Sequence, residues 1–326
     1  AHRLGSVSSS WTSWVRIVSW RSYDGSVPAA QTVAELLANS DRPTYSFEFF
    51  PPKDDAGREL LMETVDLLEP LHPDWVSITY GANGGNRDRT LGLTVELAQR
   101  AAQAQQNFLI VGHLTCTGQS RDELIAAIDA YGDAGVRNIL AIRGDMPGGA
   151  TVPWQQHPDG LSNATELVEL IRSRGDFCVG VAAFPDVHPS SSRELDIEIL
   201  LAKQQAGAQF AVTQLFFDAG HYFRMVEAAQ QAGVTIPIIG GVMPVTNIKG
   251  LGKMAELSGA DIPARVVETL LKVPDDPVMV RTAGSMIASQ LCRDLLDGGA
   301  PGLQFFTQNR SIATREILAM LRASGY

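Results

Sequence analysis

The chain alternates short, almost continuous apolar runs with longer segments whose apolar residues recur every three or four positions. The first pattern is typical of strands buried on both faces, and the second is typical of amphipathic helices. Helices are expected between the strands, for example over residues 122–135 and 194–207. We predict eight strands, at residues 46–50, 75–81, 107–116, 137–145, 178–184, 210–217, 236–243 and 302–309.

Eight buried strands that alternate with helices favour a parallel sheet covered on both faces and closed on itself. We therefore predict an α/β fold, a (β/α)8 TIM-type barrel, with residues 30–326 forming a single catalytic domain. Residues 246–297 interrupt the alternation, because they hold two or three helical segments between strands seven and eight. Residues 1–29 are rich in Ser and hold three of the five Trp, and we interpret them as an N-terminal extension or a non-native remnant.

Composition narrows the choice of partner. Hydrophobic residues make up 45% of the chain, yet no apolar run approaches the roughly 18 residues needed to cross a bilayer. The net charge of -10 disfavours nucleic acid and anionic membranes, so we expect a small-molecule substrate, and self-association into a homo-oligomer stays open. Cys116, Cys178 and Cys292 form no CxxC or Cys/His pair, so no disulfide frame or metal site is expected, and a cytoplasmic location fits best.

Polar residues end nearly every apolar run, which is where barrel enzymes carry their reacting groups. We expect these residues to share one face of the barrel. They are Glu48, Thr79, Tyr80, His113, Thr115, Arg143, Asp145, His188, Gln214, Gln308, Asn309 and Arg310.

Glu48 lies in the aromatic run "SFEFFPP", where a carboxylate needs an explanation. One interpretation is a buried ion pair with a residue such as Arg143. The other is a general acid. In that case, desolvation by Phe47, Phe49 and Phe50 raises the pKa of Glu48 and keeps it protonated for transfer to a weakly basic nitrogen.

Other strand-end residues leave alternatives open. His113 is equally consistent with a satisfied core histidine, and "RGD" at 143–145 with a surface turn. Gln214 is an inward amide that can both donate and accept, which suits a heterocycle. The glycine-rich turn at 84–90 is a weak phosphate-loop candidate because it lacks the Rossmann and P-loop spacings.

Other barrel chemistries lack their required residues. A retaining glycosidase needs a second carboxylate, and strand seven, "IPIIGGVM", has none. A metal hydrolase needs clustered His ligands, but the six His are scattered. A Schiff-base aldolase needs a strand-end Lys, and only Lys53 lies near one.

Eight segments between Tyr45 and the C-terminus resemble, in order and spacing, the signature segments of the methylenetetrahydrofolate reductase family. The resemblance implies a barrel enzyme that reduces 5,10-methylenetetrahydrofolate to 5-methyltetrahydrofolate with NAD(P)H and supplies methyl groups for methionine synthesis. In the well-studied bacterial members, FAD relays the hydride. The segments are "SFEFFPPK", "VSITYGANGGNRDRT", "HLTC", "ILAIRGD", "AAFPDVHP", "AVTQLFFD", "MPVTN" and "FFTQNR".

The resemblance also implies residue roles. Glu48 matches the general acid that helps open the imidazolidine ring to an iminium, and Asp145 matches the carboxylate beside the pterin and the hydride-transfer centre. Gln214 matches the amide at the pterin edge. Arg310 and Phe306 match folate contacts, and a guanidinium suits a glutamate carboxylate. The positions that match the cofactor site are Thr79, Tyr80, His113, Arg143, Gly144, Ala164, His188 and Lys203.

The chain departs from the family where the flavin diphosphate binds. In flavin-binding members, the helix after strand five carries an Asp, an Asn three residues later, and then Arg-Lys. The corresponding residues here are Asp196, Ile199, Ala202 and Lys203. Losing one charged and one neutral hydrogen bond to a diphosphate costs about 2–4 kcal/mol, roughly a hundredfold in affinity.

We therefore expect FAD not to be held tightly and NADH or NADPH to pass its hydride directly to the folate. Asn163 and Phe184, which stand where the family has tyrosines, are further departures. Three alternatives stay open: a conventional FAD-dependent ping-pong reductase in which Arg193 replaces the missing contacts, a related pterin-binding barrel that uses a deazaflavin, and a silent folate binder.

Overall fold

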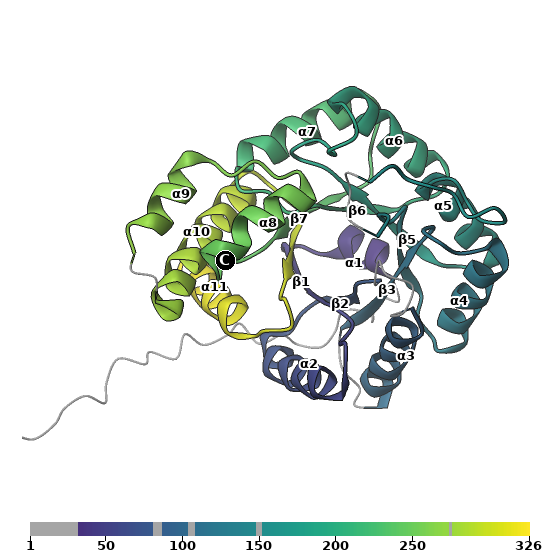
Figure 1. Cartoon of the computed structure of the whole chain (residues 1–326), viewed down its shortest axis with the longest axis horizontal. Coiled ribbons are helices and arrows are strands. Elements are labelled where there is room, and N and C mark those ends of the chain that lie inside the picture. The colour runs from purple at the N-terminus through teal and green to yellow at the C-terminus, as the bar shows by residue number, and fades with distance from the viewer. Residues whose placement is uncertain (1–31, 81–86, 104–107, 148–151, 274–275) are drawn as a thin grey trace, which may run out of the picture. The chain divides into compact units, whose positions relative to one another are not determined.

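Eight parallel strands form a closed barrel, in which each strand pairs with the next and β8 pairs with β1. The computed structural model describes residues 32–80, 87–103, 108–147, 152–273 and 276–326. The predicted barrel is thereby confirmed (Figure 1). The strands are β1 (Thr44–Phe49), β2 (Trp75–Ile78), β3 (Leu109–Thr115), β4 (Asn138–Ile142), β5 (Cys178–Ala183), β6 (Phe210–Thr213), β7 (Ile238–Val242) and β8 (Gly302–Phe306).

Helices follow the strands and surround the barrel (Figure 1). The insertion predicted between strands seven and eight is confirmed, because α8, α9 and α10 all lie there. The helices are α1 (Val33–Asn39), α2 (Asp55–Leu68), η1 (Glu69–Leu71), α3 (Arg87–Gln103), α4 (Arg121–Asp133), α5 (Ala164–Arg174), α6 (Arg193–Gln205), α7 (Ala219–Gln231), α8 (Ile248–Ser258), α9 (Ala264–Leu271), α10 (Pro277–Asp297) and α11 (Ile312–Ala323).

Several predicted strands were too long at their carboxyl ends. The strand predicted over 210–217, for example, ends at Thr213. The next apolar residues, Leu215, Phe216 and Phe217, are buried although they lie outside the strand. Apolar periodicity reports burial, so it does not mark the residue at which the chain leaves the sheet.

One end of the barrel interior is packed with apolar side chains and capped by α1, which lies within the ring of strands in Figure 1. The backbone N–H of Val33 donates to Asn138 Oδ1 at 2.8 Å, and Val33 packs in one cluster with Trp75 and Phe210. This closes the amino ends of the strands. A ligand can therefore enter the barrel only from the carboxyl ends of the strands.

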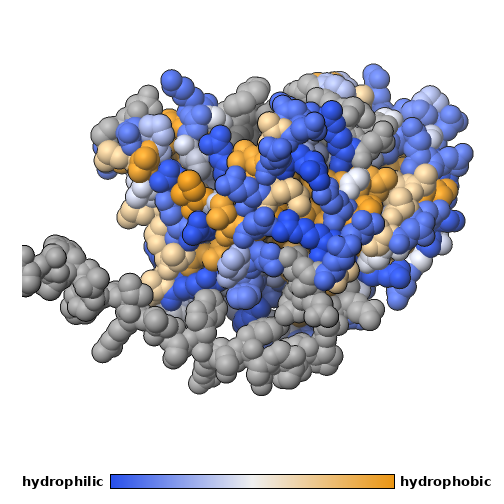
Figure 2. Space-filling model, turned by 90° about the horizontal axis from the view of Figure 1, so that it is seen from below, coloured by the Kyte–Doolittle hydropathy of each residue, from blue (hydrophilic) through white to orange (hydrophobic). Residues whose placement is uncertain are grey.

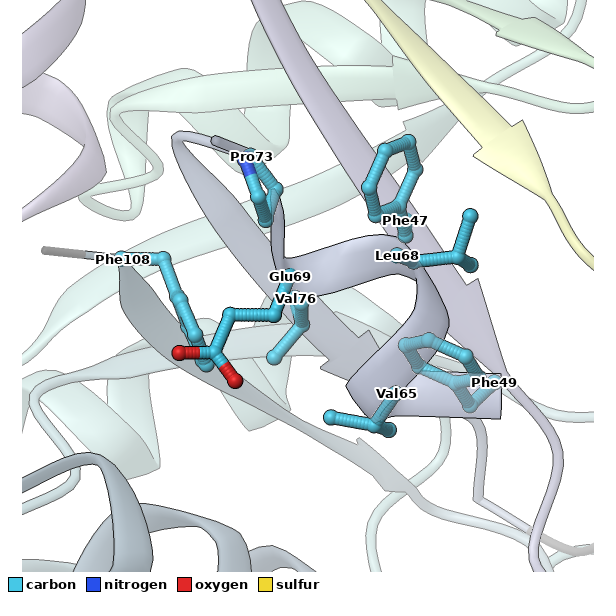
Figure 3. A pocket seen from close by; sticks show the side chains of 8 residues that line it. All are labelled: Phe47, Phe49, Val65, Leu68, Glu69, Pro73, Val76 and Phe108. Carbon is cyan, nitrogen blue, oxygen red and sulfur yellow. The ribbon is translucent and has the colours of Figure 1, made fainter. Parts of the chain in front are cut away.

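The outer face of β1 packs against α2. Phe47 and Phe49 of β1 meet Val65 and Leu68 of α2 around a small apolar gap in the packing (Figure 3). Because successive side chains of a strand point to opposite faces, the residue between the two phenylalanines points into the barrel. That residue is Glu48.

The side of the molecule shown in Figure 2 is largely hydrophilic, with apolar side chains between the polar ones. Within the described part of the chain, no helix is both long and apolar enough to cross a membrane. The described residues belong to one compact unit, Gln31–Tyr326. The predicted extension over residues 1–29 lies outside the described residues, and its boundary stays a prediction.

Candidate active site

Glu48 is held by hydrogen bonds from both neighbouring strands. Thr79, directly after β2, donates through Oγ1 to Glu48 Oε1 at 2.8 Å. Gln304 of β8 donates through Nε2 to Glu48 Oε2 at 2.6 Å. Among the described residues no Arg or Lys forms an ion pair with Glu48, and the guanidinium of Arg143 lies instead 3.8 Å from Asp145. The structure thus gives no support to the ion-pair interpretation.

Burial raises the pKa of Glu48 to about 7, and the hydrogen bonds from Thr79 and Gln304 oppose that rise. The residue is only 6% exposed. The expected source of this burial was wrong in part, because Phe47 and Phe49 point out of the barrel toward α2 (Figure 3). The barrel interior excludes water from the carboxyl group instead. At neutral pH a substantial fraction of Glu48 is therefore a protonated acid.

His113 of β3 is the titratable neighbour of Glu48, with Nε2 3.7 Å from Glu48 Oε2. Burial lowers the pKa of His113 to about 3, so the imidazole is neutral and places no positive charge beside Glu48. Neither ring nitrogen has a hydrogen-bond partner among the described residues. A satisfied core histidine would have such partners. This favours the site interpretation of His113.

The end of β4 carries the segment Arg143, Gly144 and Asp145. Gly144 has a φ of +81°, and a Cβ there would lie 2.4 Å from Thr117 Oγ1, so only glycine fits this turn. The Arg143 guanidinium lies 5.9 Å from the centre of the Trp154 ring. The side chain of Asp145 is 44% exposed, which leaves its carboxylate open to a ligand.

The loop after β5 orients His188. The carboxylate of Asp196 in α6 accepts from the backbone N–H of His188 at 2.9 Å, and the ring of His188 meets Phe184 edge-on at 5.0 Å. His188 Nδ1 accepts from the Ser190 N–H at 3.1 Å, so Nε2 carries the proton of the neutral ring. Burial lowers the pKa of His188, and the charge of Arg143 adds to this effect.

Two positions of α6 that match polar cofactor contacts of the family carry apolar side chains. Ile199 is 39% exposed, and Ala202 is half-buried one turn further along. Arg193, the proposed substitute for missing phosphate contacts, donates to the carbonyls of Phe184 and Pro185. Its guanidinium therefore already satisfies the backbone of its own loop.

Lys203 is a buried cation beside β5. Its Nζ donates to the carbonyl of Ala182 at 3.2 Å, and burial lowers the pKa of Lys203 to about 8. Arg143 lowers this pKa further and Asp196 opposes the shift, so both charges lie close enough to act on Lys203. A buried ammonium with one carbonyl partner can still donate to a ligand.

The predicted folate contacts lie at the ends of β6 and β8. Gln214 is half-buried, and its Oε1 accepts from the N–H of Leu215 at 2.9 Å. The ring of Phe306 lies against Gly241 of β7, where a Cβ would come within 2.8 Å of it. Arg310 is exposed and forms no side-chain ion pair among the described residues.

Two further predicted cofactor residues are buried. Tyr80 donates through its hydroxyl to Gln119 Oε1 at 3.0 Å. Ala164 is the first residue of α5, which Asn163 caps. In the glycine-rich turn predicted over 84–90, residues 84–86 lie outside the described residues, and residues 87–90 begin α3. The described residues hold no group of three or more His, Cys, Asp or Glu placed to bind a metal ion.

Comparison with known proteins assigns the family. The family model described as "Methylenetetrahydrofolate reductase" matches residues 33–322. The chain belongs to the methylenetetrahydrofolate reductase family. Its members are oxidoreductases that reduce methylenetetrahydrofolate, so the resemblance inferred from the eight motifs is confirmed.

Similar reductases occur in bacteria and plants. The chain is 36% identical over 282 residues to the 5,10-methylenetetrahydrofolate reductases of Pectobacterium carotovorum subsp. carotovorum and Escherichia coli (strain K12), covering 86% of this chain and 90% of each relative. It is also 36% identical over 288 residues to "Methylenetetrahydrofolate reductase (NADH) 1" of Arabidopsis thaliana, covering 84% of this chain and 47% of that one.

A solved structure has a similar fold. It is an uncharacterized protein from Clostridium thermocellum that binds two copies of 5-methyl-5,6,7,8-tetrahydrofolic acid. The TM-score is 0.60 at 14% sequence identity, and the match covers 89% of this chain and 98% of that one. At this identity the likeness concerns the fold alone.

Sequence reasoning missed one residue that contacts Glu48 and gave no specific contact to another at the mouth. Gln304 was overlooked because it lies in the middle of an apolar strand, although its spacing of two from Phe306 places both on the inner face. Asn309 was included only as a strand-end residue. Its side chain accepts from the Phe50 N–H at 2.8 Å and donates to the Phe50 carbonyl at 2.9 Å, so it joins the ends of β1 and β8.

Proposed function

We propose that this reductase converts 5,10-methylenetetrahydrofolate to 5-methyltetrahydrofolate with NADH or NADPH as the direct hydride donor, without tightly bound FAD. The observation that carries the reaction is Glu48, a buried carboxyl group with a pKa near 7 and no cationic partner in the described structure. An acid of this kind is matched to proton donation at neutral pH.

The chemistry of substrate and product determines the bond that breaks. The product keeps its methyl group on N5, so the bond between the bridging carbon and N10 must open. In the proposed step, Glu48 donates its proton to N10, the electron pair of the C–N10 bond goes to N10, and an N5 iminium forms. Hydride from the nicotinamide then adds to the iminium carbon. Glu48 is left as a carboxylate that accepts from Thr79 and Gln304 and regains a proton from water.

Four other residues are proposed to hold the folate. Asp145 supplies a negative charge that stabilises the iminium, and Gln214 offers its amide to the edge of the pterin. Phe306 supplies an apolar ring face. The exposed guanidinium of Arg310 suits the glutamate carboxylate of the folate.

The face of α6 supports direct transfer. A prosthetic flavin must stay bound through many turnovers, whereas a nicotinamide cofactor must leave after each one. Asp196 and Arg193 are already engaged by the backbone of the preceding loop, and Ile199, which is 39% exposed, offers no hydrogen-bonding group. Such a surface does not fit a tightly held flavin diphosphate, because it offers fewer hydrogen bonds to the charge than the family's polar residues would.

The nicotinamide cofactor is proposed to bind across the β2–β5 side of the mouth. Lys203 has donor capacity left for a phosphate, and His113 has two unpartnered ring nitrogens. Both substrates would then be bound together, so catalysis depends on their mutual orientation. The residues proposed for this side are Thr79, Tyr80, His113, Arg143, Gly144, Ala164, His188 and Lys203.

The three cysteines fit a reducing compartment, and we propose the cytoplasm. All three are buried free thiols. Burial raises the pKa of Cys116 to about 12 and that of Cys178 to about 11, so neither forms a reactive thiolate near neutral pH.

The visible spectrum of the purified protein and its steady-state kinetics test the proposal together. We expect a colourless protein, NADH oxidation only when methylenetetrahydrofolate is present, and intersecting double-reciprocal lines. A yellow protein with parallel lines and NADH:quinone activity would instead identify a conventional flavin enzyme. Absence of folate-dependent NADH oxidation would overturn the reaction itself, and a deazaflavin absorbance would identify the pterin-binding barrel that uses a deazaflavin.

A further inference from the structure

Beneath Glu48, the barrel interior holds a second polar layer. Gln304 of β8 is 1% exposed and pairs in register with Ser46 of β1, two residues before Glu48. The side chain of Gln304 thus lies one layer deeper than Glu48, on the side of the amino ends of the strands. The proposed mechanism so far uses it only as one donor to Glu48.

The contacts of Gln304 determine which way its amide faces. The indole Nε1 of Trp75 lies 3.3 Å from Gln304 Oε1, and Ser46 Oγ lies 3.3 Å from the same oxygen. An indole N–H can only donate, so the amide atom that faces Trp75 must be the oxygen. The NH2 group must then face Glu48, where Nε2 lies 2.6 Å from Oε2.

This orientation makes the two oxygens of Glu48 unequal. Oε2 faces an NH2 group, which can only donate, so a proton on Oε2 could not be directed toward Gln304. Oε1 faces the hydroxyl of Thr79, which can donate to a carboxylate or accept from a carboxylic acid. His113 Nε2 lies 3.7 Å from Oε2, which is too far for it to accept a hydrogen bond from that oxygen. The acid proton therefore belongs on Oε1.

Oε1 is also the oxygen nearer the mouth of the barrel. Glu48 pairs in register with Ser77 of β2, and Thr79 follows two residues later, beyond the end of that strand. Thr79 thus lies one layer nearer the carboxyl ends, where the folate is proposed to bind. The proton on Oε1 would face the substrate.

We propose that Gln304, oriented by Trp75, is the positioning residue that places the acid proton of Glu48 on Oε1 and stabilises the carboxylate left after proton transfer. This inference rests on the proposed role of Glu48 as the acid. The side chains that act on Glu48 from the β2 and β8 sides, Ser77, Thr79 and Gln304, are uncharged. Among the described residues, the titratable group that faces Glu48 is His113 of β3, which is neutral because burial lowers its pKa to about 3. Gln304 donates to the deeper oxygen at 2.6 Å.

The test is the pH dependence of kcat in the variant Gln304→Leu. The descending limb, where Glu48 loses its proton, should move up by about one to two pH units, because the carboxylate loses a strong donor. The plateau below this limb should fall at the same time, because a weaker acid transfers its proton more slowly. A loss of structure alone would lower kcat without moving the limb.

Trp75→Phe provides a second, milder variant that keeps the shape of the core. It removes the N–H that orients the amide, so the limb should move in the same direction by a smaller amount. In the Gln304→Leu background the same change should produce no further shift, because Trp75 acts through Gln304. Asn138→Leu is the matched control, since it also replaces a buried inward amide but contacts α1 at the opposite end of the barrel. Its limb should stay at the wild-type pH.

A direct titration of Glu48 gives its pKa even in variants that are inactive. The protein is labelled with 13C at the side-chain carboxyl carbon of glutamate. The resonance that is present in wild type and absent from Glu48→Gln belongs to Glu48. Its chemical shift as a function of pH gives the pKa of Glu48 in each variant. An unchanged pKa and an unchanged limb in both Gln304→Leu and Trp75→Phe would overturn the role of Gln304 while Glu48 remains the acid. Full activity of Glu48→Gln would overturn the role of Glu48 itself.

Discussion

The two sides of the barrel mouth are built differently. On the β1 side, both oxygens of Glu48 accept hydrogen bonds from side chains of the neighbouring strands, Thr79 and Gln304. On the β5 side, two charged side chains of α6 bind nearby backbone: Asp196 accepts from the His188 N–H, and Arg193 donates to the carbonyls of Phe184 and Pro185. One side directs its polar atoms at a single reacting group, and the other supports a loop.

This difference matches two tasks of the proposed mechanism. Proton transfer needs one group held in one geometry with a tuned pKa, so its surroundings must be rigid and dry. A nicotinamide cofactor that enters and leaves at each turnover gains nothing from very tight binding. The exposed Ile199 on α6 suits that second task.

Among the changes to either side of the mouth, Glu48→Gln should have the largest effect on activity. It removes the acid but keeps the size and hydrogen-bonding shape of the side chain, so kcat for folate reduction should fall about a thousandfold. NADH binding, measured by the quenching of protein fluorescence, should change little because the β5 side is intact.

Glu69→Gln is a matched control, since Glu69 lies on the outer side of the barrel beside α2 (Figure 3). It should leave kcat at the wild-type value. Comparable activity in Glu48→Gln and Glu69→Gln would show that the buried carboxyl group is not the acid.

The second largest expected effect is a change in folding stability with pH that comes from Glu48 on the β1 side. Burial raises the folded-state pKa of Glu48 from 4.5 to about 7, so the folded protein holds this proton more tightly than the unfolded chain. The stabilisation is complete below pH 4.5 and is lost as the pH rises through about 7. The loss is on the order of 3 kcal/mol, from about 1.36 kcal/mol per pKa unit.

Urea unfolding at several pH values between 5 and 8 measures this effect as a difference between wild type and Glu48→Gln. The difference isolates Glu48 from other groups such as His113, whose lowered pKa makes stability rise with pH over a lower range. Parallel pH curves for the two proteins would contradict a raised pKa for Glu48.

The smallest expected effect concerns the β5 side. The double variant Ile199→Asn with Ala202→Arg introduces the polar residues that the family resemblance implies at these positions in flavin-binding members. FAD affinity should rise by up to about a hundredfold, since one charged and one neutral hydrogen bond to the diphosphate become available. Flavin fluorescence quenching measures the affinity.

Leu195→Asn is the control on the same helix, because it adds an amide at another exposed apolar position of α6. It should leave FAD affinity unchanged. If wild type already binds FAD as tightly as the double variant, the apolar residues of α6 do not weaken FAD binding, and the proposed difference between the two sides of the mouth is wrong.

The amount of the site that could be predicted differs from residue to residue. Glu48 was recognisable because one carboxylate in an apolar strand violates the pattern around it. Gln304 violates the same pattern in β8, yet its meaning depends on Trp75 and Ser46, which lie 229 and 258 residues away along the chain. A local sequence pattern does not show which residues so far apart along the chain come into contact in the folded barrel.

The sequence by itself determined the barrel, the insertion between β7 and β8, the family and the candidate acid. These follow from periodicity and from short motifs, which are local properties of the chain. The tertiary structure decided that Phe47 and Phe49 face away from Glu48, that Arg143 lies with Asp145, and which amide atom faces the acid. Such facts depend on strand register and on contacts across the barrel, and these exist only once the strands have closed.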